Sequence, residues 1–125
     1  MPTNPRDFRQ RLLAREPLIG TLLKTPTSHA AEIIGSIGYD FVMLDEEHAP
    51  CTRQTLEVGL LGARAFGTAG LVRIARSDAN SILSVLDDGA IGVMVPHVAP
   101  AEKARDIASW SRYQGGTRGY GVGRG

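Results

Sequence analysis

A strand-like apolar run followed by a helix-like segment occurs four times in this chain, and this alternation constrains the fold more than any other feature. The four predicted strands cover residues 19–23, 41–44, 70–75 and 91–95. Each run is short and apolar on both faces, which is typical of strands buried in a parallel sheet. Parallel strands need crossover connections, usually helices, so the pattern predicts an α/β fold.

Five helices are predicted from capping residues and from apolar residues at helical spacing. The first opens at Asn4 or Pro5 and runs through Arg15, before the first strand. The others follow the four strands, over residues 29–38, 52–66, 78–90 and 100–113. Beyond Tyr113 the periodicity gives way to GGTRGYGVGRG, which we expect to be a loop.

Two architectures fit four strand–helix units. A flavodoxin-like doubly wound sheet needs about five strands, whereas a (β/α)₈ TIM barrel needs eight strands and about 250 residues. Four units in 125 residues have the repeat density of a barrel. A half barrel would leave two open sheet edges, and the chain stops inside a glycine-rich loop. We therefore expect a single domain over residues 1–125, an N-terminal helix and about the first four βα units of a barrel that is cut near its middle.

Composition argues against several classes of partner. The formal net charge is +1 and the basic residues are scattered, so there is no electrostatic case for nucleic acid or a membrane. The tail resembles an RNA-binding RGG segment only weakly. No apolar run approaches the roughly 20 residues of a membrane span. Cys51 is the only cysteine, which excludes an intrachain disulfide, and the N-terminus lacks a secretory h-region. These features predict a cytoplasmic protein.

Polar residues gather where the predicted strands end. Lys24 and Thr25 follow the first strand, the DEEH segment of residues 45–48 follows the second, Arg73 lies in the third and His97 follows the fourth. The carboxyl ends of parallel strands carry the ligand site in α/β folds, so these residues are candidates for an active site.

Each candidate also has an ordinary structural interpretation. Asp45 is as well explained by a turn or a cap, and a histidine such as His48 is by itself more often structural than catalytic. A neighbouring carboxylate can orient an imidazole, which favours a functional role for His48. A charge such as Arg73 in an apolar strand is rarely buried without a partner, and in a barrel mouth it would suit a carboxylate or an enolate.

The chain resembles the HpcH/HpaI aldolases, the metal-dependent class II pyruvate aldolases that include 2-oxo-3-deoxy sugar acid and 2,4-dihydroxyhept-2-ene-1,7-dioate aldolases. The most specific shared element is D-x-E-H-A-P, here residues 45–50. The V-R strand and the L-D-x-G-A turn follow at the family's spacing. The resemblance extends from IGTLLKTPTSHAAEIIGSIGYD through the tail, nearly the whole chain.

The resemblance implies a role for each matching residue. His48 is similar to the general base that handles the C4 hydroxyl proton, and Asp45 to the carboxylate that supports it. Arg73 looks like the residue that binds the pyruvate oxygens and stabilises the enolate. Asp87 resembles an aspartate that reaches the site of a neighbouring subunit in a homo-oligomer, which would explain a carboxylate near a helix C-terminus. Glu47 is expected to support a metal-bound water.

The implied reaction is cleavage of a 4-hydroxy-2-oxo acid to pyruvate and an aldehyde, with a divalent ion such as Mg²⁺, Mn²⁺ or Co²⁺ as cofactor. The metal ligands of the family, a Glu and an Asp, come from later strands, and the resemblance places them beyond Gly125. We therefore expect no metal ligands within this chain and little activity from it alone. Two alternatives stay open: an enzyme like the citrate lyase β-subunit or malyl-CoA lyase, and a non-catalytic half barrel that oligomerises.

Overall fold

The computed structural model describes residues 7–124 and contains one four-stranded parallel sheet. The strands are β1 (Gly20–Leu23), β2 (Phe41–Asp45), β3 (Ala69–Arg73) and β4 (Gly92–Met94). They lie side by side in chain order, β1-β2-β3-β4, and every neighbouring pair is parallel. A doubly wound sheet reverses its strand order at a switch point, and the described part of the chain has no such reversal. This order is that of a partial (β/α)₈ barrel.

A helix follows each strand, as predicted: α2 (Ser28–Ser36), α3 (Arg53–Ala65), α4 (Ala79–Asp87) and α5 (Ala101–Trp110). The side chains of Thr27, Thr52 and Asp78 cap the first three of these helices. The first helix, α1 (Phe8–Leu13), precedes the sheet, and its predicted start at Asn4 or Pro5 lies outside the described residues. No described helix has the length and apolarity that a membrane crossing requires.

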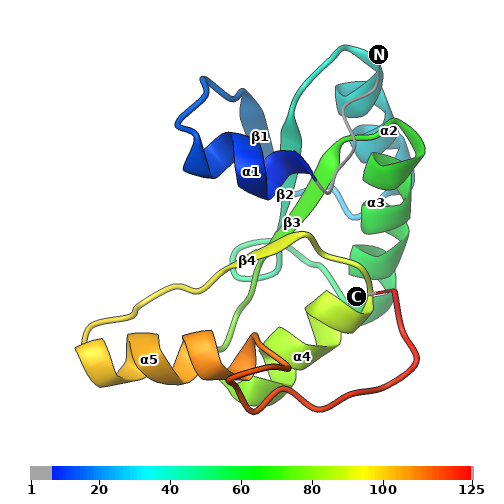
Figure 1. Cartoon of the computed structure of the whole chain (residues 1–125). Coiled ribbons are helices and arrows are strands. Elements are labelled where there is room, and N and C mark those ends of the chain that lie inside the picture. Colours follow the sequence, from blue (N-terminus) through cyan, green and yellow to red (C-terminus); the bar gives the residue numbers. More distant parts are fainter. Residues whose placement is uncertain (1–6, 125) are drawn as a thin grey trace.

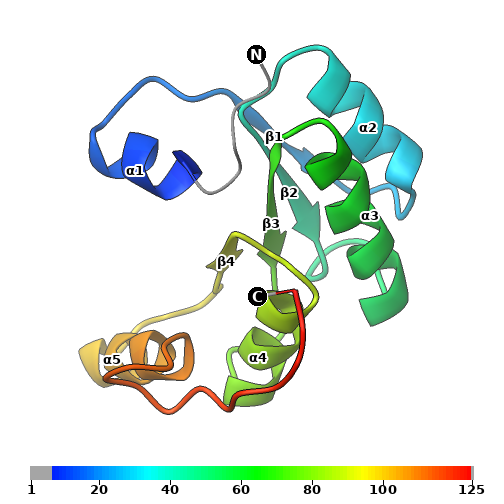
Figure 2. The same cartoon turned by 45° about the vertical axis from the view of Figure 1, so that its right-hand side comes forward.

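The helices divide between the two faces of the sheet. Figures 1 and 2 show α2 and α3 on one side of the strands and α1 on the other. The consecutive helices α2, α3, α4 and α5 contact one another in that order, as right-handed crossovers in a consecutive sheet require. The face that carries α2 and α3 corresponds to the outside of a barrel, and the opposite face to its inside.

Alternate residues of each strand define the two faces. On the outer face, Leu44 and Val72 pack with Leu56 and Leu60 of α3 and belong to the largest buried cluster. On the inner face, Phe8 of α1 packs in a second cluster with the strand side chains Phe41, Met43, Ala69 and Leu71. The next inward positions along β2 and β3 are Asp45 and Arg73, which face each other in the strand register. The apolar inner face therefore ends in a charged layer at the carboxyl ends of the strands.

Candidate active site

The centre of the charged layer is an ion pair between Asp45 at the end of β2 and Arg73 at the end of β3. The Nε and NH2 groups of Arg73 donate to the two carboxylate oxygens of Asp45 at 3.0 and 2.6 Å. The Asp45 side chain is fully buried, whereas a fifth of the Arg73 side chain stays exposed. Such a two-point contact fixes the plane of the guanidinium. The remaining N–H donors of Arg73 are thereby held at the mouth of the half barrel.

Asp45 also organises the loop that follows β2. Its Oδ1 accepts hydrogen bonds from the main-chain N–H groups of Glu47 and His48, both at 3.1 Å. Lys24 adds a positive charge, with Nζ 4.0 Å from Oδ2. The guanidinium hydrogen bond from Arg73, aided by the N–H of His48 and opposed by desolvation, lowers the pKa of Asp45 to about 2. The carboxylate is therefore ionised at neutral pH, and its contact with His48 runs through the main chain.

Glu47 connects three of the surrounding side chains. Its Oε1 lies 3.0 Å from Nε2 of His97, and its Oε2 lies 3.6 Å both from Nε2 of His48 and from Nε of Arg73. The side chain of Glu47 is largely buried, whereas those of His48 and His97 are 60% and 86% exposed. Glu47 thus holds two open imidazoles beside the guanidinium, where an entering molecule can reach them.

The neighbouring Glu46 has a different position. Its carboxylate accepts the N–H of Ala75 at 3.0 Å, and its own N–H donates to the carbonyl of Arg73 at 2.9 Å. These contacts join the loops that follow β2 and β3, so Glu46 braces the site rather than facing an open mouth.

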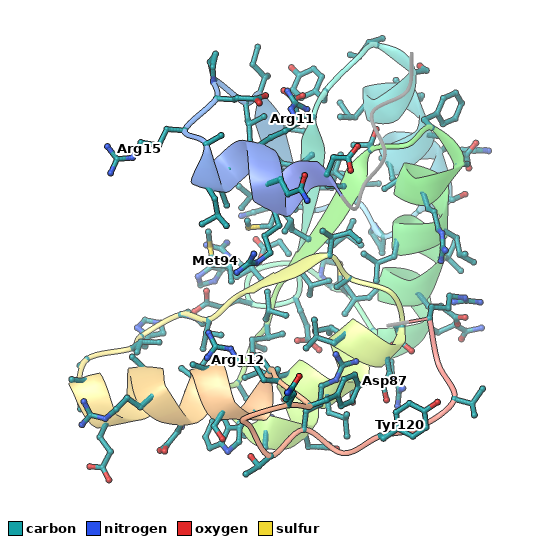
Figure 3. The ribbon with its side chains drawn as sticks, in the orientation of Figure 1. Arg11, Arg15, Asp87, Met94, Arg112 and Tyr120 are labelled. Atoms are coloured by element: carbon teal, nitrogen blue, oxygen red, sulfur yellow. The ribbon has the colours of Figure 1, made fainter. Side chains whose placement is uncertain are left out.

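Asp87 lies at the C-terminal end of α4 and makes no hydrogen bond or ion pair with Asp45, Glu47 or His48. Arg118 from the glycine-rich tail donates to it at 2.7 Å, and the N–H of Arg124 donates to its carbonyl at 2.8 Å. Figure 3 shows the tail, which carries Tyr120, passing close to Asp87. The charge that compensates Asp87 at this helix end therefore comes from within the chain.

The structure brings together Asp45, Glu47, His48 and Arg73 of the predicted site residues, and adds Lys24 and His97. The sequence placed Lys24 and His97 at strand ends without assigning them a role. Their location at the same sheet edge as the other candidates was the signal that they belong to the site. His97 adopts a left-handed backbone conformation, with φ of 57°. This conformation is uncommon for a residue other than glycine.

The described residues alone do not form a metal centre. Nowhere within residues 7–124 do three or more His, Cys, Asp or Glu side chains converge as a group that could hold a metal ion. Glu47 and His97 are close enough to contribute, but each is engaged with the other.

Comparison with known proteins identifies the family. The model of the HpcH/HpaI aldolase/citrate lyase family matches residues 19–122, which include the four described strands and the whole candidate site. The chain belongs to this family. As a HpcH/HpaI family member, it carries the D-x-E-H-A-P element in the loop that Asp45 caps and the V-R strand as β3.

Two curated relatives of this HpcH/HpaI chain are aldolases by name. The hydroxypyruvate/pyruvate aldolase of Delftia acidovorans is 40% identical over 124 residues, or 98% of this chain and 45% of that protein. The 2-keto-3-deoxy-L-rhamnonate aldolase of Shigella sonnei is 39% identical over 121 residues, covering 96% of this chain and 45% of that protein. This chain thus spans about half the length of the curated relatives that it matches.

A solved structure shares the fold. The HpcH/HpaI aldolase of Desulfitobacterium hafniense superposes with a TM-score of 0.84 at 31% identity, over 90% of this chain and 44% of that one. The expected family and the parallel α/β fold are therefore both confirmed.

Proposed function

We propose that this chain is the N-terminal half of a (β/α)₈ pyruvate aldolase that cleaves 4-hydroxy-2-oxo acids to pyruvate and an aldehyde. The observation that carries the proposal is the layer of Asp45 and Arg73 at the carboxyl ends of β2 and β3, with Glu47 and His48 in the following loop. Family membership supports the chemistry, and the curated relatives bear aldolase names.

In this proposal Arg73 binds the 2-oxo acid and stabilises the enolate. Two of its N–H groups are held by Asp45, and a guanidinium has five. The others remain to meet the carboxylate and 2-oxo oxygens of a substrate, where negative charge grows as the carbon–carbon bond breaks. Because Asp45 fixes the guanidinium plane before binding, little reorganisation is needed when that charge appears.

His48 is the proposed base for the C4 hydroxyl. Imidazole is the side chain suited to gaining and losing a proton near neutral pH, and His48 is open to an entering substrate. The main-chain hydrogen bond from its N–H to Asp45 fixes the start of the loop. Glu47 lies within 3.6 Å of the imidazole and can hold its orientation.

The complete enzyme is proposed to need a divalent cation such as Mg²⁺, Mn²⁺ or Co²⁺, with its ligands outside the described residues. The carboxylates of Asp45 and Glu47 lie beside the guanidinium of Arg73 at this end of the sheet, and Nζ of Lys24 is 4.0 Å from Asp45. An anionic substrate gains from an added positive charge in such surroundings, and a divalent ion supplies Lewis-acid chemistry when bound.

The proposal includes a cytoplasmic homo-oligomer in which Asp87 serves a neighbouring subunit's histidine. A quarter of the Asp87 side chain is exposed while Arg118 holds one of its oxygens. The other oxygen is the one that would meet a partner.

A chimera tests the proposed activity. Residues 1–125 replace the matching segment of the Delftia hydroxypyruvate/pyruvate aldolase, and pyruvate release from 4-hydroxy-2-oxo acids is followed through lactate dehydrogenase with Mg²⁺ or Mn²⁺ present. We expect turnover by the chimera, a loss of at least about 100-fold with His48→Ala or Arg73→Ala, and little activity from the 125-residue chain alone. Asp106→Asn, an exposed substitution on α5, is the matched control.

Turnover that is unchanged by both substitutions in a folded chimera would refute the proposed roles. A folded chimera that releases no pyruvate from any of these acids would refute the proposed substrate class. In that case citrate is the next substrate to assay, because the matching family model also covers citrate lyases.

A further inference from the structure

The carboxylate of Glu47 depends on one side chain for its hydrogen bonding. The Glu47 side chain is only 13% exposed, and a carboxylate so far withdrawn from water needs donors within the protein. Among the described residues, its one hydrogen-bond partner is His97, whose Nε2 lies 3.0 Å from Oε1. Nε of Arg73 and Nε2 of His48 both lie 3.6 Å from Oε2, which exceeds a hydrogen-bond length. His97 is therefore the group that fixes the position of this carboxylate.

The backbone of His97 is in the left-handed region, with φ of 57°, which is unfavourable for a residue that carries a Cβ atom. His97 directly follows Pro96, and turns that place a left-handed residue after a proline favour glycine or asparagine there. Within residues 7–124, neither the main-chain N–H nor the carbonyl of His97 makes a main-chain hydrogen bond that would explain this conformation. In the same residues its one polar contact is that of the imidazole with Glu47. A strained histidine where glycine would be unstrained indicates a role for the imidazole.

We propose that His97 is a positioning residue that keeps the carboxylate of Glu47 off the guanidinium of Arg73. The inference rests on the proposed function, in which Arg73 binds the 2-oxo acid. Glu47 and Arg73 are adjacent but not hydrogen-bonded, with 3.6 Å between Oε2 and Nε. Without the imidazole, Glu47 would turn to the fixed cation beside it and occupy N–H groups that the substrate needs. His97 therefore controls the affinity of Arg73 for an anion by acting through Glu47.

Two substitutions of His97 separate backbone strain from the position of the side chain. His97→Gly removes the imidazole and relieves the left-handed backbone, whereas His97→Gln keeps an N–H donor and the strain. In the chimera with the Delftia aldolase, His97→Gly should raise KM for a 4-hydroxy-2-oxo acid about 10- to 100-fold, the range for one hydrogen bond to a charged group. Its kcat should stay within about threefold of wild type, and its urea midpoint should not fall. His97→Gln should show the reverse, a KM near that of wild type and a midpoint no higher than wild type.

Arg15→Gly is the matched control. Arg15 has nearly the same backbone conformation, with φ of 58°, but it is exposed just beyond the end of α1. Figure 3 shows its side chain pointing away from the strands. Glycine relieves the same conformation at both positions, so the urea midpoint of Arg15→Gly should change as that of His97→Gly does, while KM stays at the wild-type value. A rise in KM in both glycine variants, or in neither, would overturn the inference.

Calorimetric titration of the chimera with pyruvate in the presence of Mg²⁺ tests whether His97 acts through Glu47. His97→Gly should weaken pyruvate binding about 10- to 100-fold on its own, but by less than about threefold in the background of Glu47→Gln, because an amide carries no charge to compete for Arg73. An equal loss in both backgrounds would overturn the inference and show that His97 contacts the ligand itself.

The two proposals fail in different ways. An active chimera in which His97→Gly leaves KM and pyruvate affinity unchanged would refute the role of His97 alone. A folded chimera that neither binds pyruvate nor releases it from any 4-hydroxy-2-oxo acid would refute the proposed function and, with it, the role of His97.

Discussion

Replacing Asp45 by asparagine tests whether one buried carboxylate holds Arg73 and the His48 loop together. The pKa of Asp45 is about 2, against an ordinary value of 3.8. One pKa unit corresponds to roughly 1.4 kcal/mol, so the ionised carboxylate stabilises the folded chain by about 2 kcal/mol at neutral pH. Asparagine keeps an oxygen for the main-chain N–H groups but offers no charge to Arg73. Because part of Arg73 stays in water, we expect a cost near 2 kcal/mol, below the roughly 3–5 kcal/mol of a fully buried pair.

The sign of the pH dependence follows from the lowered pKa. A carboxylate whose pKa is lower in the folded chain stabilises it above the unfolded pKa of 3.8, and the effect is lost as pH falls through about 2. The difference between wild type and Asp45→Asn should therefore be about 2 kcal/mol at pH 7 and roughly half of that at pH 3. Asp40 and Asp78 also have lowered pKa values, but they act alike in both proteins and cancel in the difference.

Urea unfolding followed by circular dichroism at pH 7, 5, 4 and 3 measures this difference, at one fixed chain concentration because association would shift the midpoint. Asp106→Asn is the control, since it removes an exposed carboxylate from α5, and we expect it to stay within about 0.5 kcal/mol of wild type at each pH. Equal stability of Asp45→Asn and wild type at pH 7 would refute the reasoning. A difference that does not shrink between pH 5 and pH 3 would show that the cost is steric.

Three further changes test contacts elsewhere in the fold. Gly62→Ala should cost about 1–3 kcal/mol in urea unfolding, because its new Cβ would lie 2.8 Å from a main-chain oxygen at the start of α2, whereas Gly119→Ala meets nothing within 4 Å. Thr52→Ala removes the capping box of α3 and should cost about 1 kcal/mol in the same assay. A loss of stability smaller than that of Gly119→Ala would contradict this expectation. Arg118→Met should speed hydrogen exchange in the tail, since it breaks the 2.7 Å bond to Asp87, and unchanged exchange there would show that other contacts hold the tail.

Hydrophobic patterning predicted the four strands and their order of appearance, but it placed several boundaries incorrectly. The third strand was predicted to reach Ala75, whereas its pairing with β2 ends at Arg73. The reason is that Ile74 stays fully buried against the helices after pairing with β2 ends. The buried residues therefore extend beyond the paired residues of β3. A pattern of apolar residues predicts burial, so it overestimates the length of this strand. That the strands lie in chain order was also not contained in the pattern, since a doubly wound sheet has the same alternation.

The site was predicted less completely than the fold, because its contacts depend on register and on distant segments. The sequence singled out Asp45 and Arg73 separately, and only the pairing of β2 with β3 sets them opposite each other. The contact of Glu47 with His97 joins residues 50 positions apart. The partner of Asp87 could not be predicted because the tail that provides Arg118 has no periodicity. The catalytic roles that the resemblance implies for His48, Arg73, Asp45 and Asp87 remain predictions.

Two neighbouring strands are sufficient to build the central layer of the site. Asp45 binds the guanidinium of Arg73 through both oxygens and the N–H groups of the His48 loop through one of them. The proposed anion-binding group and the proposed base are therefore positioned by the same carboxylate, and that carboxylate lies in the interior of the described sheet rather than at either open edge. Closing the barrel would add a wall and the proposed metal ligands around this layer, but its internal geometry does not require them. It follows that substrate binding at Arg73 should depend on Asp45 more strongly than on what covers β1 or β4.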